Sequence, residues 1–287
     1  MRFPSFALPR QNLTDLALLA GAAALLPFIP DKTTGPLHAF NPYKIWLIVT
    51  LLLGIGTLGQ LLCRFVGTRA GLPLAGFVSG FVSSTATILA LGLQAKQHPA
   101  SHEPCVAGAT ASCVATYAQM ALLLMALSTP LLQALLPALA LGCVASALYS
   151  ISFIHRAAAN TDIELPAGKP IITLRTALAM AGLIALISFA VVALNHFVGE
   201  KGVWLGAALA GLSDAHAAGA TVATLVQQGQ MDVAAGIIPV MLGLTTNTLL
   251  RAVLATTTGS KIYAQELIPG LALGLGAAWA GTLFILL

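Results

Sequence analysis

Apolar runs long enough to cross a lipid bilayer follow one another along nearly the whole chain. A helix needs about 20 apolar residues to span roughly 30 Å of hydrocarbon. None of these runs alternates like a strand, and lipid admits only helices and closed barrels, so we predict an all-α integral membrane protein of about nine transmembrane helices. The nine candidate segments are Leu13–Phe28, Ile45–Cys63, Gly71–Ala95, Cys105–Leu127, Leu131–Ile154, Ile171–Phe197, Gly202–Val226, Val233–Thr257 and Leu267–Leu287.

Charged residues are few and dispersed. They make up 8% of the 287 residues, against roughly 25% in an ordinary soluble domain. The 13 Lys and Arg residues lie scattered without a basic run, which argues against a nucleic-acid partner. The four cysteines form no C-x-x-C pair, so we expect buried free thiols. The expected partners are the lipid bilayer and a small ion or solute, and a homo-oligomer is compatible with the chain.

Two halves of the sequence resemble each other. The stretch "GLPLAGFVSGFVSSTATILAL" from Gly71 aligns with "GVWLGAALAGLSDAHAAGATV" from Gly202, and each follows a matching "FVG". Further on, "PALALGCVASAL" from Pro137 aligns with "PGLALGLGAAWA" from Pro269. If every segment crosses the membrane fully, the two four-helix repeats share one orientation and are parallel repeats. The predicted organisation is an N-terminal span and loop at 1–43, repeat 1 at 44–155, a linker at 156–170 and repeat 2 at 171–287.

The alignment places Ser83 opposite Asp214, and each lies halfway along its apolar segment. Both residues are therefore expected near the bilayer midplane. A carboxylate there costs about 2.5–3.5 kcal/mol on insertion scales, so it should face a cavity or the bundle interior and find a partner. We predict that Asp214 binds an ion. The alternative is a structural ion pair or a protonated, hydrogen-bonded acid.

His216 follows Asp214 by two residues, which on a regular helix would turn the two side chains about 200° apart. They can address one ligand only if the helix is unwound, and Gly211 and Gly219 on either side make a break plausible. We therefore expect broken helices in the third and seventh segments, with Asp214 and His216 as metal ligands. The alternative for His216 is a hydrogen bond to a neighbouring helix.

Hydroxyl side chains crowd the middle of the third segment, at Ser83, Ser84, Thr85 and Thr87. Small hydroxyl residues often line tight helix seams or bond back to their own helix. However, Gly-interrupted segments at matching places in two halves point to a transporter site. The hydroxyls would supply oxygen ligands for a hard cation, or donors for an anion.

The eighth segment adds Asn247 and Arg251, which lie four residues apart on one helix face. Arg251 could extend toward the membrane surface or reach Asp214. No phosphate-binding loop, serine nucleophile elbow or H-E-x-x-H motif occurs, so we do not expect an enzyme. The complete candidate site is Ser83, Ser84, Thr85, Thr87, Asp214, His216, Asn247 and Arg251.

Four stretches are similar to the motifs of a known family: "FNPYKIWLIVTLLLGIGTLGQ", "GFVSGFVSSTATILAL", "LAGLSDAHAAGATVATL" and "TTNTLLRAVLATTTG". From about Leu16 onward the sequence resembles the bacterial membrane family called domain of unknown function 4010, which is often fused behind an MgtC/SapB-type domain that this sequence does not contain. The resemblance implies a multi-pass protein of the bacterial inner membrane. The association of MgtC-type proteins with magnesium-limited growth favours inorganic ions.

The sequence departs from the family at two positions. Where the family has a second acid two residues after the first, this chain has His216, and Arg251 stands where the family has a lysine. The loss of an acid weakens the transfer of a divalent-cation role.

These observations predict a membrane transporter or channel for a small inorganic ion, with a metal cation favoured, or for a small solute. No cofactor is expected beyond a bound metal ion or a coupling proton. One alternative is a regulatory or assembly subunit that binds a partner protein, which would bury Asp214 away from water. Another is a membrane-embedded lipid-handling enzyme with Asp214 and His216 as acid and base, which would place His216 at headgroup depth.

Overall fold

The computed structural model describes residues 10–35, 40–66, 71–156 and 174–286, and within them the chain is almost entirely helical. The predicted all-α membrane class is confirmed. The linker predicted at 156–170 lies, apart from Arg156, outside the described residues. The α-helices are α1 (Arg10–Leu25), α2 (Pro42–Val66), α3 (Gly71–Gln97), α4 (His102–Leu127), α5 (Thr129–Ile154), α6 (Leu174–Val198), α7 (Glu200–Ser213), α8 (Ala215–Gln227), α9 (Val233–Thr258) and α10 (Lys261–Leu286).

Seven of the described helices are long and apolar enough to cross a membrane, namely α2, α3, α4, α5, α6, α9 and α10. The N-terminal apolar helix is shorter, at Leu16–Phe28. The seventh predicted segment is divided between α7 and α8, of 14 and 13 residues, and neither alone spans roughly 30 Å. The chain is therefore a multi-pass membrane protein in which at least one segment is broken.

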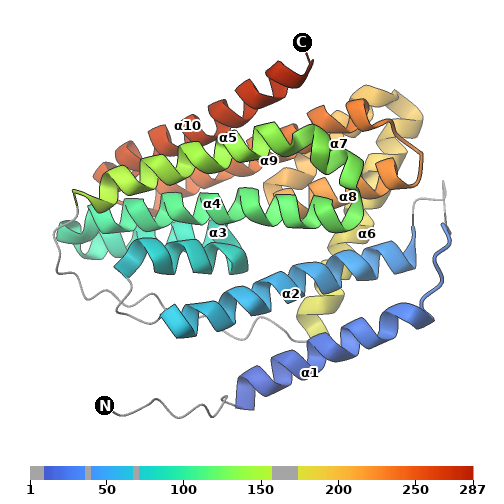
Figure 1. The fold of residues 1–287 in the computed structure, drawn as a ribbon, viewed down its shortest axis with the longest axis horizontal. Coiled ribbons are helices and arrows are strands. Elements are labelled where there is room, and N and C mark those ends of the chain that lie inside the picture. Colours follow the sequence, from blue (N-terminus) through green and yellow to red (C-terminus); the bar gives the residue numbers. More distant parts are fainter. Residues whose placement is uncertain (1–9, 36–39, 67–70, 157–173, 287) are drawn as a thin grey trace.

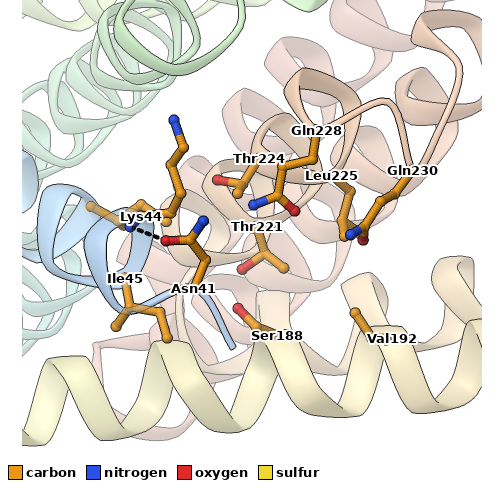
Figure 2. Close-up of a pocket in the computed structure, with 11 residues that line it drawn as sticks. Asn41, Lys44, Ile45, Ser188, Val192, Thr221, Thr224, Leu225, Gln228 and Gln230 are labelled. Carbon is orange, nitrogen blue, oxygen red and sulfur yellow. Dashed lines mark hydrogen bonds between the residues drawn. The ribbon is translucent and has the colours of Figure 1, made fainter. Parts of the chain in front are cut away.

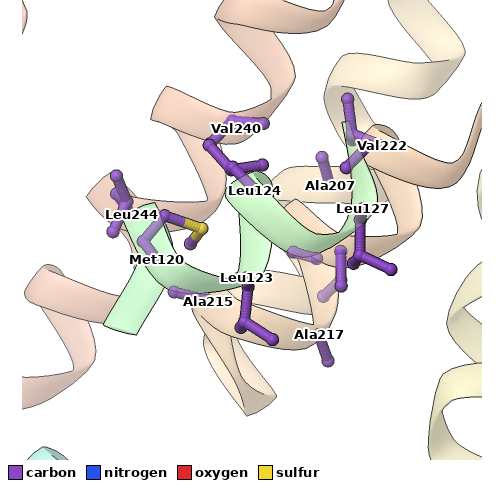
Figure 3. Packing of buried hydrophobic residues seen from close by; sticks show 14 of the residues in the cluster. Met120, Leu123, Leu124, Leu127, Ala207, Ala215, Ala217, Val222, Val240 and Leu244 are labelled. Carbon is purple, nitrogen blue, oxygen red and sulfur yellow. The ribbon is translucent and has the colours of Figure 1, made fainter. Parts of the chain in front are cut away.

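The centre of the molecule is a close contact between α4 and the second half of the chain. In Figure 3, Met120, Leu123 and Leu124 of α4 lie among side chains from α7, α8 and α9. Because lipid tails are as apolar as leucine, van der Waals packing rather than removal from water holds such helices together. Small side chains on the facing helices, such as Ala207 and Ala217, allow this close approach.

Helix α3 is not a straight rod but folds back on itself at Ser83. This residue has extended backbone angles, φ −170° and ψ 105°, inside an otherwise helical stretch. The hydroxyl oxygens of Ser79 and Thr87 lie 2.9 Å apart, whereas eight residues along a straight helix would separate them by about 12 Å. Gly76 before the break and Leu91 after it both pack against Gly108 of α4. The two arms of α3 therefore form a re-entrant hairpin with its tip at Ser83.

Helices α7 and α8 form a second hairpin of the same kind, with its tip at Asp214. This residue is also extended, at φ −160° and ψ 119°. Gly211 before the break and Ala218 after it both contact Gly243 of α9. In Figure 1 the two short helices lie together near one end of the molecule. The breaks expected in the third and seventh segments are confirmed, and each of them reverses the chain.

Helices that the repeat alignment makes equivalent run in opposite directions. Pairing Pro137 with Pro269 also pairs Gly142 with Gly274 and Ser146 with Ala278. In the structure Gly142 packs against Ala278, and Ser146 packs against Gly274, so α5 and α10 are antiparallel. Under the alignment these two contacts are equivalent, with the roles of α5 and α10 exchanged. This is the pattern of a two-fold symmetric interface.

The expected parallel orientation of the two repeats is therefore corrected to an inverted one. The expectation assumed that all segments cross the membrane. A re-entrant hairpin enters and leaves on the same side, so a unit of three crossing helices and one hairpin makes an odd number of crossings. The second unit then starts from the opposite face, which is the arrangement of inverted-topology repeats in many transporters.

Candidate functional site

The residue at each hairpin tip caps the helix that follows it. Ser83 Oγ accepts a hydrogen bond of 3.2 Å from the Ala86 amide. Asp214 Oδ1 accepts one of 2.9 Å from the His216 amide. Ser and Asp are preferred caps because their short side chains satisfy amides that have no partner in the first turn. The alignment of Ser83 with Asp214 thus pairs two residues that both cap the following helix, one with a neutral side chain and one with a charged side chain.

Two helix ends meet at each tip, so each tip carries the partial charges of helix ends. The arm before the break ends in carbonyl groups without helical partners, and the arm after it begins with free amides. The first end carries a partial negative charge and the second a partial positive charge. In the second hairpin the amide end receives the Asp214 carboxylate, and one carbonyl near the end of α7, that of Gly211, accepts from a side chain of α9.

Asp214 and His216 contact each other directly. His216 Nδ1 lies 3.0 Å from Asp214 Oδ1, and His216 Nε2 lies 3.4 Å from the Thr116 carbonyl oxygen. The break at Asp214 removes the expected turn of about 200° between the two side chains. Both neighbours of the imidazole are acceptors, so a ring nitrogen that carries a hydrogen can donate to the one it faces. The imidazole therefore links the second tip to α4.

Asp214 is the more accessible member of this pair. Its side chain is 29% exposed, whereas that of His216 is 10% exposed. A carboxylate beside a broken helix can add a ligand without giving up its cap, because it has two oxygens. Asp214 can thus bind a cation while Oδ1 stays bonded to His216.

The four hydroxyls of the first hairpin have different environments. Ser84 and Thr87 are buried, Thr85 is half-buried and Ser83 is exposed. Thr87 donates a hydrogen bond of 2.9 Å to the Ser83 carbonyl and closes the hairpin beside Ser79. Ser84 accepts from Thr116 of α4 at 2.9 Å. Ser84 and Thr87 therefore hold the tip together, and Ser83 and Thr85 remain the hydroxyls best placed to meet a ligand.

Asn247 holds the second hairpin as Thr116 holds the first. Its amide nitrogen donates a hydrogen bond of 3.0 Å to the Gly211 carbonyl, near the end of α7. The same register continues into α4 and α9, which begin at His102 and Val233, and it pairs Thr116 with Asn247. Both lie near the middle of helices of 26 residues, which places both tips about halfway across the membrane.

Thr116 is the residue that sequence reasoning missed. Its hydroxyl bonds Ser84 in one hairpin, and its carbonyl faces His216 in the other. One hydroxyl among several on α4 gives little signal, but its equivalence to Asn247 in the other unit would have identified it.

Arg251 does not pair with Asp214, contrary to one expectation from the sequence. It is 4% exposed, and its guanidinium donates to Ser84 Oγ at 2.5 Å and lies 4.0 Å from Cys113 Sγ. Among the described residues no carboxylate lies within ion-pair distance of it. The structure thus brings Arg251 to the first hairpin and leaves Asp214 with His216.

A complete metal cage of protein side chains is not found in the described parts of the chain, where no three His, Cys, Asp or Glu side chains gather. Asp214 and His216 meet as predicted, but they meet as a pair. Further oxygen ligands for a cation would have to be hydroxyls, carbonyls or water, which are ligands suited to hard cations.

A polar hollow opens beside α8, at the end of the molecule where α8 joins α9. Its open part has a volume of about 540 Å³ and is lined by Asp31, Lys32, Thr33, Asn41, Lys44, Gln227, Gln228 and Gln230. A second, small pocket of about 20 Å³ lies between α2, α6 and α8, shares Asn41 and Gln228 with the hollow, and is lined by Ser188 and Thr221 on its other side (Figure 2). Thr221 lies seven residues, or about 10 Å, from Asp214 along α8. One side of α8 thus carries both the small pocket, at Thr221, and the second tip, at Asp214.

Fold and site together define a class: a multi-pass helical membrane protein with two inverted units, whose re-entrant hairpins carry polar tips joined through α4 and α9. The chain belongs to the family described as domain of unknown function (DUF4010), whose model matches residues 50–259. That range includes both hairpins, Thr116, Asn247 and Arg251. No curated protein and no solved structure matches the chain.

Proposed function

We propose that this protein is a transporter or channel of the bacterial inner membrane, which moves a small inorganic ion, by preference a metal cation, through a site at the hairpin tips. The observation that carries the proposal is the matched pair of breaks at Ser83 and Asp214, at the same depth in two inverted units. Discontinuous helices meeting near the midplane of inverted repeats are the usual construction of ion and substrate sites in secondary transporters.

The cost of these features supports a functional role. Each break gives up helical hydrogen bonds inside the membrane, where an unsatisfied backbone group costs several kcal/mol. A carboxylate and an imidazole are added at the same depth. Packing alone would be served better by two unbroken apolar helices. Ionisable residues at this depth generally mark ion pathways or proton relays.

The roles of the individual residues follow from their contacts. Asp214 would supply the negative charge for the cation, and its partial exposure leaves one oxygen open to it. Ser83, Thr85 and the carbonyl end of α7 would supply neutral oxygen ligands. His216 would exchange its proton with Asp214 as the cation arrives or leaves, because cation and proton compete for the same carboxylate.

The polar hollow beside α8 supports access from one face of the membrane. Thr221, Thr224 and Gln228 lie along one side of α8 and continue the line from the hollow toward Asp214. In an inverted repeat, exchange of the conformations of the two units would open the corresponding path beside α3 from the other face.

The two alternatives fit the geometry less well. A regulatory subunit that used this region for tight packing would have Asp214 fully buried, whereas its side chain is 29% exposed. An enzyme acting on lipid headgroups would need His216 near the membrane surface. His216 instead contacts Thr116, near the middle of α4.

Flux measurements in proteoliposomes test the proposal. We expect the wild-type protein to move at least one of Na⁺, K⁺, Mg²⁺, Mn²⁺ or H⁺, detected by ion-selective fluorescent dyes. Asp214→Asn keeps the shape of the cap but removes the charge, so flux should fall about tenfold or more, as expected for losing a charged ligand.

Asp232→Asn is the matched control, because Asp232 is an exposed carboxylate that precedes α9 and makes no side-chain cap hydrogen bond. It should leave the flux unchanged. The proposal fails if no cation moves, or if Asp214→Asn transports as fast as the control.

A further inference from the structure

Arg251 carries a permanent charge and forms no direct ion pair with any described carboxylate. A guanidinium stays protonated in proteins, so burial cannot neutralise it. Arg251 is 4% exposed, and its hydrogen-bond contacts in the described structure are a neutral hydroxyl, Ser84 Oγ, and the sulfur of Cys113. Asp214, the acid of the site, lies near enough to interact electrostatically with Arg251, but its direct contact is with His216. Buried charges in membranes are normally paired, because an isolated charge is costly there.

The Nε atom of Arg251 is a buried donor without an acceptor. It forms no hydrogen bond with any described residue. Arg251 lines a small cavity of about 10 Å³ between α4, α5, α9 and α10. A buried N–H without an acceptor is destabilising, and more so when the group is charged. An acceptor in this cavity would satisfy the donor and balance the charge together.

The other groups around the cavity favour an anion over a cation. Tyr117 and Ser146 line it from α4 and α5, and Asn247, whose amide nitrogen is bonded to Gly211, lines it from α9. Tyr117 Oη and Ser146 Oγ both lie beside Gly274 of α10, whose missing side chain leaves them space. Hydroxyls can donate to an anion, and the formal charge at the cavity wall is that of the guanidinium.

The cavity size limits the ion. About 10 Å³ is close to the smallest space that holds a single water molecule. A tetrahedral oxyanion such as phosphate would not enter without moving helices, whereas a monatomic halide is only slightly larger than water. The two units also differ here, since the alignment pairs Arg251 with Met120 of α4, which is apolar. One halide site per chain follows.

We propose that this cavity binds a single chloride ion, held by Arg251 Nε and by the hydroxyls of Tyr117 and Ser146, as the resident counter-ion of Arg251. The site is separate from the cation site proposed at Asp214, and it does not depend on transport. Chloride would stabilise the contact between Arg251 and Ser84, and through it the tip of the first hairpin.

Equilibrium binding of radioactive chloride to the detergent-purified protein tests the proposal directly. We expect saturable binding of one ion per chain, displaced by bromide but not by gluconate, which is too large for the cavity. Arg251→Met, which installs the residue found at the equivalent position of the first unit, should abolish binding. Failure of the wild-type protein to bind chloride overturns the proposal and leaves water as the occupant.

A second measurement does not require the charge-removing variant to fold. The thermal midpoint of the wild-type protein is measured at constant ionic strength as chloride replaces gluconate. It should rise by about 2–4 °C when the chloride concentration reaches about ten times its Kd. Ser146→Ala should weaken chloride binding about tenfold, as expected for loss of one hydrogen bond to a charged group.

Ser152→Ala is its control, because Ser152 lies on the same helix and bonds its own backbone at an exposed position. A midpoint that does not respond to chloride contradicts the site. Equal affinity in Ser146→Ala and Ser152→Ala contradicts the assigned cavity.

Discussion

Thr116 shows how one small polar residue can organise the centre of a membrane protein. It is buried on α4, it donates to Ser84 in the first hairpin, and its carbonyl faces His216 in the second. Thr116 itself carries no charge. The two tips are therefore linked through a residue that does not itself titrate.

Thr116→Val tests this link at the residue scale. Valine has nearly the same shape but removes one of the two donors to Ser84 Oγ, the other being Arg251, so we expect the free energy of unfolding to fall by about 1 kcal/mol. Cation flux should fall as well, because the two tips lose their common support. Both quantities can be measured on one preparation, by unfolding in mixed micelles and by flux in proteoliposomes.

Thr256→Val is the matched control, since Thr256 bonds its own helix at an exposed position on α9. If Thr116→Val matches this control in stability and in flux, Thr116 does not join the tips.

At the scale of elements, each hairpin requires glycine where it lies against its neighbouring helix. A Cβ atom on Gly211 would overlap the backbone of Gly243 on α9, and one on Gly76 would overlap Gly108 on α4. Such close approach is how helices associate in membranes, where small residues replace the hydrophobic effect as the basis of contact. The two short helices α7 and α8 can stay beside α9 because these positions carry no side chain.

Gly211→Ala tests the close contact. We expect overpacking to lower the free energy of unfolding by about 1–3 kcal/mol, because the α9 backbone cannot yield as a side chain would. Gly276→Ala on α10 is the control, since nothing lies within 4 Å of the added methyl group. Helix propensity alone predicts that Gly276→Ala is neutral or slightly stabilising. Equal stability of the two variants would show that the hairpin does not depend on the glycine contact.

Sequence reasoning recovered the helices and the breaks but not the direction of the chain. Hydropathy identifies a segment such as 71–97 as long enough to span, because it measures apolar length and not path. Ser83 and Asp214 could be found because they are polar at aligned positions. The reversal of the chain at each of them depends on contacts such as that between Ser79 and Thr87. A local sequence pattern does not predict such contacts. The partner of Arg251 was missed for the same reason.

At the scale of the whole molecule, the hairpins decide the topology. With nine full crossings, the connection between α3 and α4 would lie on the same face as the connection between α8 and α9. With two re-entrant hairpins, the two connections lie on opposite faces, and the units are inverted. An inverted pair can expose one central site to either side in turn, which is the basis of the proposed transport.

Accessibility of single cysteines in sealed vesicles of known orientation tests this architecture most directly. Ala100→Cys marks the connection between α3 and α4, and Gln230→Cys marks that between α8 and α9; both positions are exposed. Thr33→Cys, beside Gln230 at the polar hollow, is the reference. In a chain lacking its own cysteines, an impermeant maleimide should label Gln230→Cys and Thr33→Cys from one face and Ala100→Cys from the other. Labelling of Ala100→Cys and Gln230→Cys from the same face would contradict the inverted hairpins.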